Sequence, residues 1–170
     1  GRDASMGEAT SALVSDIEAL NVNAAGLGSM AGMQIFAEHQ EWFGTVRFET
    51  LSVAAPFKFM LPGKVLPGSI GLTAHLLHAG SFGSYLATDY GQLSGTFTFS
   101  SLWFRLGYGL QLVKTPGMEI NAGANLVLVS KNMGEQGATD RDKEIKPSLD
   151  VSTLFTFYHG SSSLRSVIGE

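Results

Sequence analysis

The stretch from Leu102 to Leu112 alternates strictly between large apolar residues and small or polar ones. A β-strand points successive side chains to opposite faces, so a period of two residues predicts a strand rather than a helix. The apolar face of this strand carries Leu102, Phe104, Leu106, Tyr108, Leu110 and Leu112. The other face carries Trp103, Arg105, Gly107, Gly109 and Gln111, where the two glycines are expected to leave room.

The same alternation recurs along the rest of the chain, around residues 70–76, 120–131 and 149–157. Extended segments are expected at 33–42, 45–56, 69–78, 96–112, 118–131 and 147–158. These segments exceed the 5 or 6 residues typical of soluble strands and suit tilted membrane strands of about 9–11 residues. The pattern predicts an all-β, antiparallel meander of about six long strands.

The predicted links alternate between tight and long. Tight links are expected at Phe43-Gly44 and Thr115-Pro116-Gly117, long polar ones at 79–95 and 132–146, and a link rich in proline at 57–68. If the N-terminal leader lies in the periplasm, the links at 79–95 and 132–146 fall outside the cell, as barrels prefer. Aromatic residues near strand ends are candidates for interfacial girdles, namely Trp42, Phe43, Phe57, Phe59, Phe157 and Tyr158.

The leader, residues 1–32, differs from the alternating part, residues 33–170, and is expected to be a separate segment. Apolar residues at helical spacing, with Ser15 and Glu18 in capping-box spacing, predict one short helix over residues 11–20. The following residues 21–28 contain two Asn and two Gly, which favour turns and positive φ.

Composition bears on what the apolar face touches. The 170 residues are 44% hydrophobic and only 15% charged, with mean hydropathy +0.14. A soluble sandwich would cover the face with a second sheet, and its polar positions would usually be Lys, Glu, Thr or Arg rather than Gly, Ser, Asn or His. The pattern therefore favours a membrane barrel with a polar lumen. A net charge of −4 without a basic cluster argues against nucleic-acid binding, and the absence of cysteine excludes disulfides and thiolate metal sites.

Three short stretches carry a family resemblance: residues 2–9 (Arg-Asp-Ala-Ser-Met-Gly-Glu-Ala), 16–20 and 23–27 (Asn-Ala-Ala-Gly-Leu). They resemble the start of PorV/PorQ-type proteins and their relatives in the FadL-like outer-membrane β-barrel superfamily. These proteins open with Arg-x-x-x-Met-Gly-x-Ala and reach an Asn-Pro-Ala-Gly-Leu box. Here Ala24 stands in place of the proline, which removes a fixed φ and restores an N–H.

The resemblance implies an outer-membrane barrel in which the leader folds inward as a hatch. The hatch residues would be Asn21, Asn23, Ala24, Ala25, Gly26 and Leu27. Since even the smallest transmembrane barrels take about 8 strands, the 170 residues are expected to be the N-terminal part of a longer barrel.

The resemblance to FadL-like barrels further implies passive transport of fatty-acid-like hydrophobic molecules across the outer membrane of a Gram-negative cell. Similarity to PorV implies an alternative, a type IX secretion component that docks exported proteins at the link 79–95. A soluble β-sheet domain with a structural or binding role is the third hypothesis. The candidate lumen and ligand contacts are His75, Leu77, Trp103, Arg105, Gln111, Asn125 and Val127.

Candidate catalytic and metal-binding residues give weak signals. His75 and His78 would lie on opposite faces of a strand, where they cannot easily hold one metal ion. His39 and Glu41 share a face, yet no nucleophile accompanies them, and we interpret them as lumen polarity. Asp140, Asp142 and Glu144 lack the glycine and spacing of a calcium loop. We therefore expect no enzyme activity, no metal and no cofactor.

Overall fold

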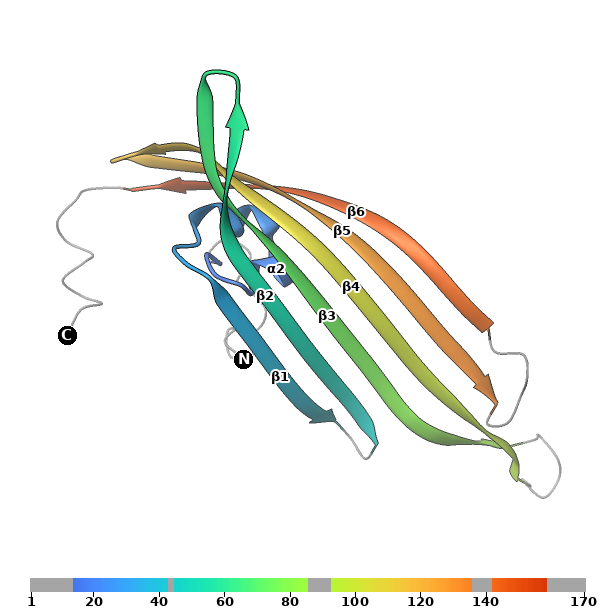
Figure 1. Ribbon diagram of the computed structural model, residues 1–170. Helices are drawn as coiled ribbons and strands as arrows, with labels where there is room; N and C mark the ends of the chain where they lie inside the picture. The colour runs from blue at the N-terminus through green and yellow to red at the C-terminus, as the bar shows by residue number, and fades with distance from the viewer. Residues whose placement is uncertain (1–13, 43–44, 86–92, 136–141, 159–170) are drawn as a thin grey trace, which may run out of the picture.

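The computed structural model describes residues 14–42, 45–85, 93–135 and 142–158. They form six long antiparallel strands that pair in chain order, preceded by a short helical segment (Figure 1). The predicted meander is thus confirmed, and the sheet is not closed, because β1 and β6 are its two edges. The elements are α2 (Ala19–Val22), the 3-10 helix η1 (Ala24–Ser29), β1 (Gln34–Trp42), β2 (Val46–Leu61), β3 (Lys64–Tyr85), β4 (Leu93–Thr115), β5 (Met118–Glu135) and β6 (Asp142–Phe157).

The strands run further than the sequence pattern predicts. The expected link at 57–68 is instead the end of a hairpin, in which β2 turns into β3 around Gly63 with φ +79°. Pro56 and Pro67 are tolerated there because β1 pairs with β2 only up to Ala54, and β4 pairs with β3 only from Gly68. The outer parts of the expected links 79–95 and 132–146 are strand, because β3 extends to Tyr85, β4 begins at Leu93, β5 extends to Glu135 and β6 begins at Asp142. Residues 86–92 and 136–141 lie outside the described residues.

The helix expected over residues 11–20 is shorter and begins later. Residues 14–18 are not helical, and α2 starts at Ala19. The Asp16 side chain accepts a hydrogen bond from the Glu18 N–H, and the Ile17 N–H donates to the Gln34 side chain in β1. Local polar partners thus satisfy these amides without a helix. No helix within the described residues is long and apolar enough to cross a membrane.

The glycines of the leader also act differently from expectation. Gly26 and Gly28 do not take positive φ; of the glycines in the described ranges, only Gly63 does. Their role is close approach, because a Cβ on Gly26 would lie 2.3 Å from the Val14 carbonyl oxygen, and one on Gly28 would lie 2.8 Å from that of Leu110.

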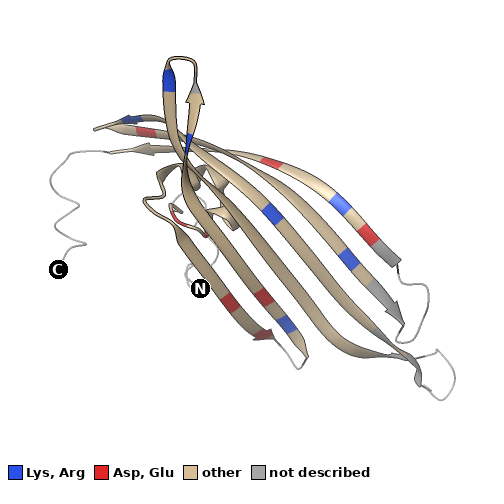
Figure 2. Cartoon of the chain, in the orientation of Figure 1, with Lys and Arg blue, Asp and Glu red and all other residues tan. Residues whose placement is uncertain are grey.

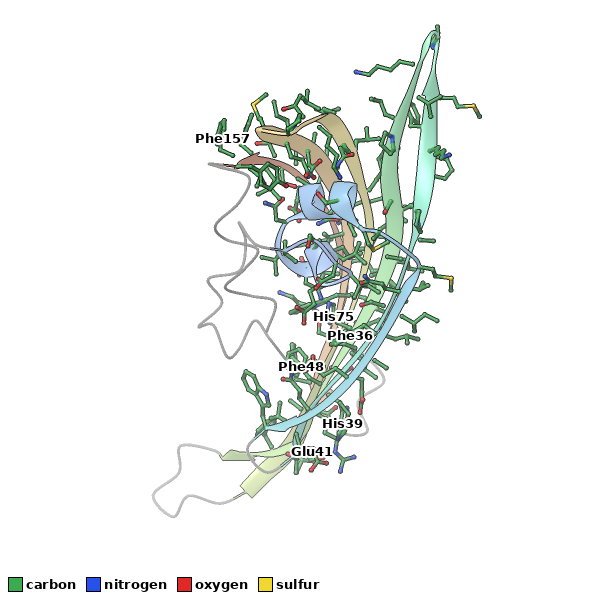
Figure 3. The ribbon with its side chains drawn as sticks, turned by 90° about the vertical axis from the view of Figure 1, so that its left-hand side faces the viewer. Phe36, His39, Glu41, Phe48, His75 and Phe157 are labelled. Carbon is green, nitrogen blue, oxygen red and sulfur yellow. The ribbon has the colours of Figure 1, made fainter. Side chains whose placement is uncertain are left out.

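The core lies between the leader and one face of the sheet. We call residues 14–30 the hatch segment, and the sheet face beneath it the inner face (Figure 3). Leu20 packs where Gly71 and Gly107 have no side chain: a Cβ there would lie 2.8 and 2.4 Å from its methyl carbons. The room expected at Gly107 and Gly109 is therefore filled by the hatch segment. The buried cluster comprises Val14, Ile17, Ala19, Leu20, Leu27, Met30 and Ala54.

Candidate functional site

The strand register sorts the side chains onto the two faces. Thr73 pairs with Arg105 and Arg105 with Val127, while His75 pairs with Trp103, so these side chains share the inner face with the hatch segment. The structure places all the candidate lumen residues on this face: His75, Leu77, Trp103, Arg105, Gln111, Asn125 and Val127. Their role as ligand contacts stays a prediction.

Asn21, in α2, joins the hatch segment to the middle of the inner face. Its Oδ1 accepts hydrogen bonds from His75 Nε2 at 3.0 Å and from Arg105 Nη1 at 2.9 Å. His75 Nδ1 lies 2.9 Å from the Thr50 hydroxyl. A neutral imidazole that donates from Nε2 and accepts at Nδ1 satisfies both contacts. One amide oxygen therefore couples the hatch segment to β3 and β4.

Asn23 and Ala25 hold the turn that follows. The Ala25 N–H reaches both the Asn23 side chain and the Ser152 hydroxyl in β6, each at 3.1 Å. Ala24 is the first residue of η1, and Asn23 before it is extended, with φ −159° and ψ 100°. The first helical position after an extended residue is one that proline also accepts, so the conformation at Ala24 is compatible with either residue. Ala24, Ala25, Gly26 and Leu27 are all buried.

A row of aromatic rings crosses the inner face next to Asn21. Ring centroids lie 5.8 Å apart for Trp42 and Phe48, 6.5 Å for Phe48 and Trp103, and 6.1 Å for Trp103 and His75. The prediction that Trp42 belongs to an interfacial girdle is therefore wrong. Its position in β1 places it on the inner face, together with Phe36. Sequence reasoning also missed Phe48, although the alternation of β2 could have revealed it.

A buried carboxylate ties the other end of the hatch segment to the sheet. Glu119 is 5% exposed and accepts hydrogen bonds from Gln111, Asn121 and Tyr158, each at 3.0 Å, and from the Ser29 hydroxyl. Such bonding is what a buried charge requires. Tyr158 is therefore an inner-face donor and not the girdle residue expected from the sequence. The sequence did not indicate Glu119 as a site residue, because two of its donors, Ser29 and Tyr158, lie 90 and 39 residues away.

The outer face is apolar along whole rows of paired residues. The row at the middle of the sheet reads Ile35, Val53, Leu72, Leu106, Leu126 and Leu149, and its neighbour reads Ala37, Leu51, Ala74, Phe104, Leu128 and Pro147. Leu72, Leu106 and Leu126 are 45%, 47% and 44% exposed. A polar row follows near the end of the sheet where β1, β3 and β5 finish: Glu41, Arg47, His78, Ser100 and Asn132. The charges of the sheet lie mainly toward its ends (Figure 2).

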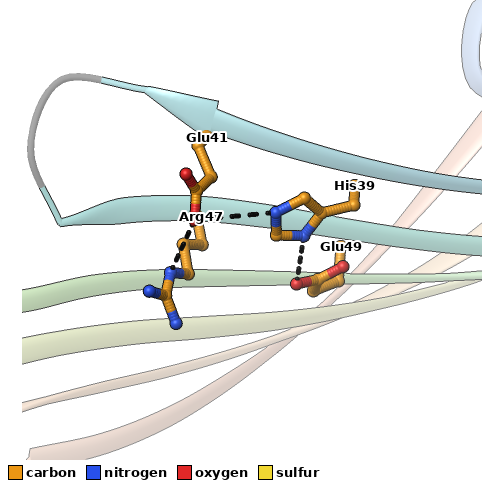
Figure 4. Close-up of polar contacts among 4 residues, drawn as sticks. All are labelled: His39, Glu41, Arg47 and Glu49. Atoms are coloured by element: carbon orange, nitrogen blue, oxygen red, sulfur yellow. Dashed lines mark hydrogen bonds and ion pairs between the residues drawn. The ribbon is translucent and has the colours of Figure 1, made fainter.

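Part of this polar end is a charged cluster on β1 and β2 (Figure 4). His39 Nδ1 lies 2.7 Å from Glu49, and its Nε2 lies 3.7 Å from Glu41, which also pairs with Arg47 at 3.3 Å. The cluster lies on the outer face, so the interpretation of His39 and Glu41 as lumen polarity is wrong. Both side chains are more than half exposed, and solvation weakens such pairs.

The remaining polar candidates are not brought together. His75 is on the inner face and His78 on the outer face, as the two-residue period predicts. Asp140 lies outside the described residues, and Glu144 pairs with Lys146 at 2.7 Å. Within the ranges described, no group of three or more His, Cys, Asp or Glu residues could hold a metal ion.

Comparisons of the chain with protein-family models, with curated proteins and with solved structures gave no match. The resemblance of the leader therefore remains an expectation. The functional argument rests on the geometry of the two faces.

Asn21→Ala tests the contact between the hatch segment and the sheet. The variant leaves His75 Nε2 and Arg105 Nη1 without their acceptor, which costs about 1–3 kcal/mol. We expect faster hydrogen exchange of the hatch amides, whereas Asn21→Asp, which keeps an acceptor oxygen, retains their protection. Exchange of the hatch amides at the wild-type rate in Asn21→Ala would show that Asn21 does not hold the segment.

Proposed function

We propose that the chain supplies six strands of an outer-membrane β-barrel, with the hatch segment inside the lumen. The observation that carries this proposal is the uncharged middle of the outer face, where Leu72, Leu106 and Leu126 lie side by side and almost half exposed. Contiguous apolar surfaces of this kind are rare in water. They are what the lipid-facing side of a barrel requires.

The limits of the apolar band support the same proposal. Charged residues close it at one end, and at the other Phe57 and Phe59 pack against Tyr108, with ring centroids 6.2 and 6.4 Å apart. On β2, the span from Arg47 to Phe57 is about 33 Å along the strand, or about 23 Å along the membrane normal at 45° tilt. This height is close to the apolar band of outer-membrane barrels, about 25 Å, which aromatic girdles flank.

The open edges define what the proposal requires. β1 and β6 each lack a partner on one side among the described residues. Unpaired backbone groups in hydrocarbon cost several kcal/mol each, so further strands must pair with both edges in the membrane. Those strands belong to the barrel that we propose.

Two features of the inner face support the proposal that the barrel passes hydrophobic molecules with a polar end. The aromatic row from Trp42 to Trp103 offers apolar contact and ends beside Arg105. The buried Nε of Arg105 has no hydrogen-bond partner within the described residues, which leaves it for an acceptor such as a carboxylate. Fatty-acid-like molecules combine these two properties.

The docking of exported proteins would use the link 79–95, of which residues 86–92 lie outside the described part.

Leu106→Arg tests the membrane assignment in the intact protein. An arginine near the bilayer midplane costs about 2–4 kcal/mol, whereas near the interface it costs about 0–1 kcal/mol. Ser100→Arg is the matched control, because Ser100 lies on the same strand and face but in the polar row. We expect urea unfolding from lipid vesicles to show a large loss of stability only for Leu106→Arg. Equal tolerance of both would favour a soluble domain.

Trp103→Ala tests the transport assignment. Loss of the ring removes the contacts with Phe48 and His75, and we expect the affinity for oleate to fall about tenfold, a change of about 1.4 kcal/mol. Phe104→Ala is the control, since its side chain lies on the outer face of the same strand. Fluorescence titration of the reconstituted protein measures both. An unchanged affinity for Trp103→Ala would contradict transport along this row.

A further inference from the structure

The β2–β3 hairpin projects beyond the rest of the sheet. β1 pairs with β2 only up to Ala54, and β4 pairs with β3 only from Gly68. Residues 57–67, which we call the tip ribbon, are therefore bounded by neither β1 nor β4. Figures 1 and 3 show the ribbon diverging from the ends of β5 and β6, on the side away from the hatch segment.

The tip ribbon exposes apolar and cationic side chains together. Met60 is 80% exposed and pairs across the ribbon with Val65, which is 56% exposed; Lys58 shares their face. The opposite face carries Phe57 and Phe59, which are 48% and 42% exposed, with Lys64. The ribbon contains no acidic residue, and exposed Lys114 lies at the end of β4, next to its last residue, Thr115.

We propose that the tip ribbon is an interfacial anchor that binds anionic phospholipid headgroups. Lys58 and Lys64 contact the phosphates, while Phe59, Met60 and Val65 lie among the headgroups and the first acyl carbons. Basic and apolar residues in one segment are the usual composition of interfacial membrane contacts. This inference rests on the proposed function, because the barrel is what brings the ribbon to the bilayer surface.

The position of the ribbon supports this occupant. Phe57 marks the aromatic end of the apolar band, and the ribbon continues from it to Leu61, about 14 Å along the strand or about 10 Å along the normal at 45° tilt. The headgroup layer on each side of the hydrocarbon is about 6 Å thick. The ribbon therefore passes through this layer, and its direction away from the hatch segment takes it outward over lipid.

The two faces of the ribbon favour lipid over a protein partner. A folded partner that packs on one face would leave the other face, with its own apolar residues and lysine, in water. A headgroup layer surrounds the ribbon and contacts both faces at once. Lysine side chains can extend along apolar surface and place their ammonium groups at the phosphates.

Labelling at single cysteines tests this anchor, because the chain has no cysteine of its own. Met60→Cys carries an environment-sensitive fluorophore in the intact protein, reconstituted into phosphatidylcholine vesicles with or without phosphatidylglycerol. A second label at Leu106→Cys reports on barrel insertion. We expect lipids with a nitroxide near the headgroup to quench the Met60 label severalfold more when phosphatidylglycerol is present. Lys58→Glu with Lys64→Glu is expected to abolish that gain and leave the Leu106 label unchanged.

The outcomes separate the anchor from the barrel. If the Leu106 label is quenched by lipid but the Met60 label remains in water, the anchor is refuted and the barrel stands. If neither label is quenched, both proposals fail. If quenching of the Met60 label is the same with and without phosphatidylglycerol and does not change in the lysine variants, the headgroup contact is refuted. If the Met60 label is protected from aqueous iodide but is not quenched by lipid, a protein partner covers the tip ribbon, and the lipid anchor is refuted.

Discussion

The two-residue period, kept in register from β1 to β6 across the middle of the sheet, is the constraint on which the rest of the structure depends. Side chains of one face stay on that face only while neighbouring strands hold their pairing, and a slip of one residue would exchange the faces. Across the middle of the sheet, the register places apolar residues beside apolar residues, from Ile35 to Leu149. One sheet thereby acquires two chemically different surfaces.

The inner surface is built for a close backbone neighbour. Glycines at 71, 107, 109 and 123 bring the hatch segment so near that an added Cβ on any of them would fall within 3.0 Å of hatch atoms. Polar contacts then orient the segment, with Asn21 at its middle and Ser29 near its end. The compact core lies only on this side, which leaves the outer surface exposed. That imbalance is the physical reason for proposing a lipid surrounding.

The sequence alone could predict the number of strands, their antiparallel order and the face on which each candidate lumen residue lies. These features follow from local alternation. It could not predict that β2 and β3 continue through Pro56 and Pro67, because tolerance of a proline depends on where the neighbouring strands stop pairing. The prediction of a helix over residues 11–20 was wrong for a similar reason. The Ile17 N–H, which a helix would use for a backbone hydrogen bond, donates instead to the side chain of Gln34, 17 residues away.

The site shows the same division between local and distant information. The inner-face position of His75 and Arg105 was predictable, but their shared acceptor Asn21 lies 54 and 84 residues away. The alternation of β1 did not assign Trp42 to a face, because β1 has apolar residues on both sides of the sheet. The same ambiguity applied to His39, and only its pairing with Glu49 in β2 places it on the outer face.

The most direct measurement of what the outer face touches is a nitroxide scan of β4 from residue 102 to residue 110 in lipid vesicles. Each position except Gly107 and Gly109, where an added side chain would clash with the hatch segment, is replaced by cysteine and labelled. Collision rates with oxygen and with a water-soluble nickel complex are then compared. We expect oxygen to dominate at the even positions, which include Phe104 and Leu106, and both collision rates to be low at position 105, whose side chain lies against Asn21 of the hatch segment. Dominant collision with the nickel complex at the even positions would contradict a lipid-facing surface.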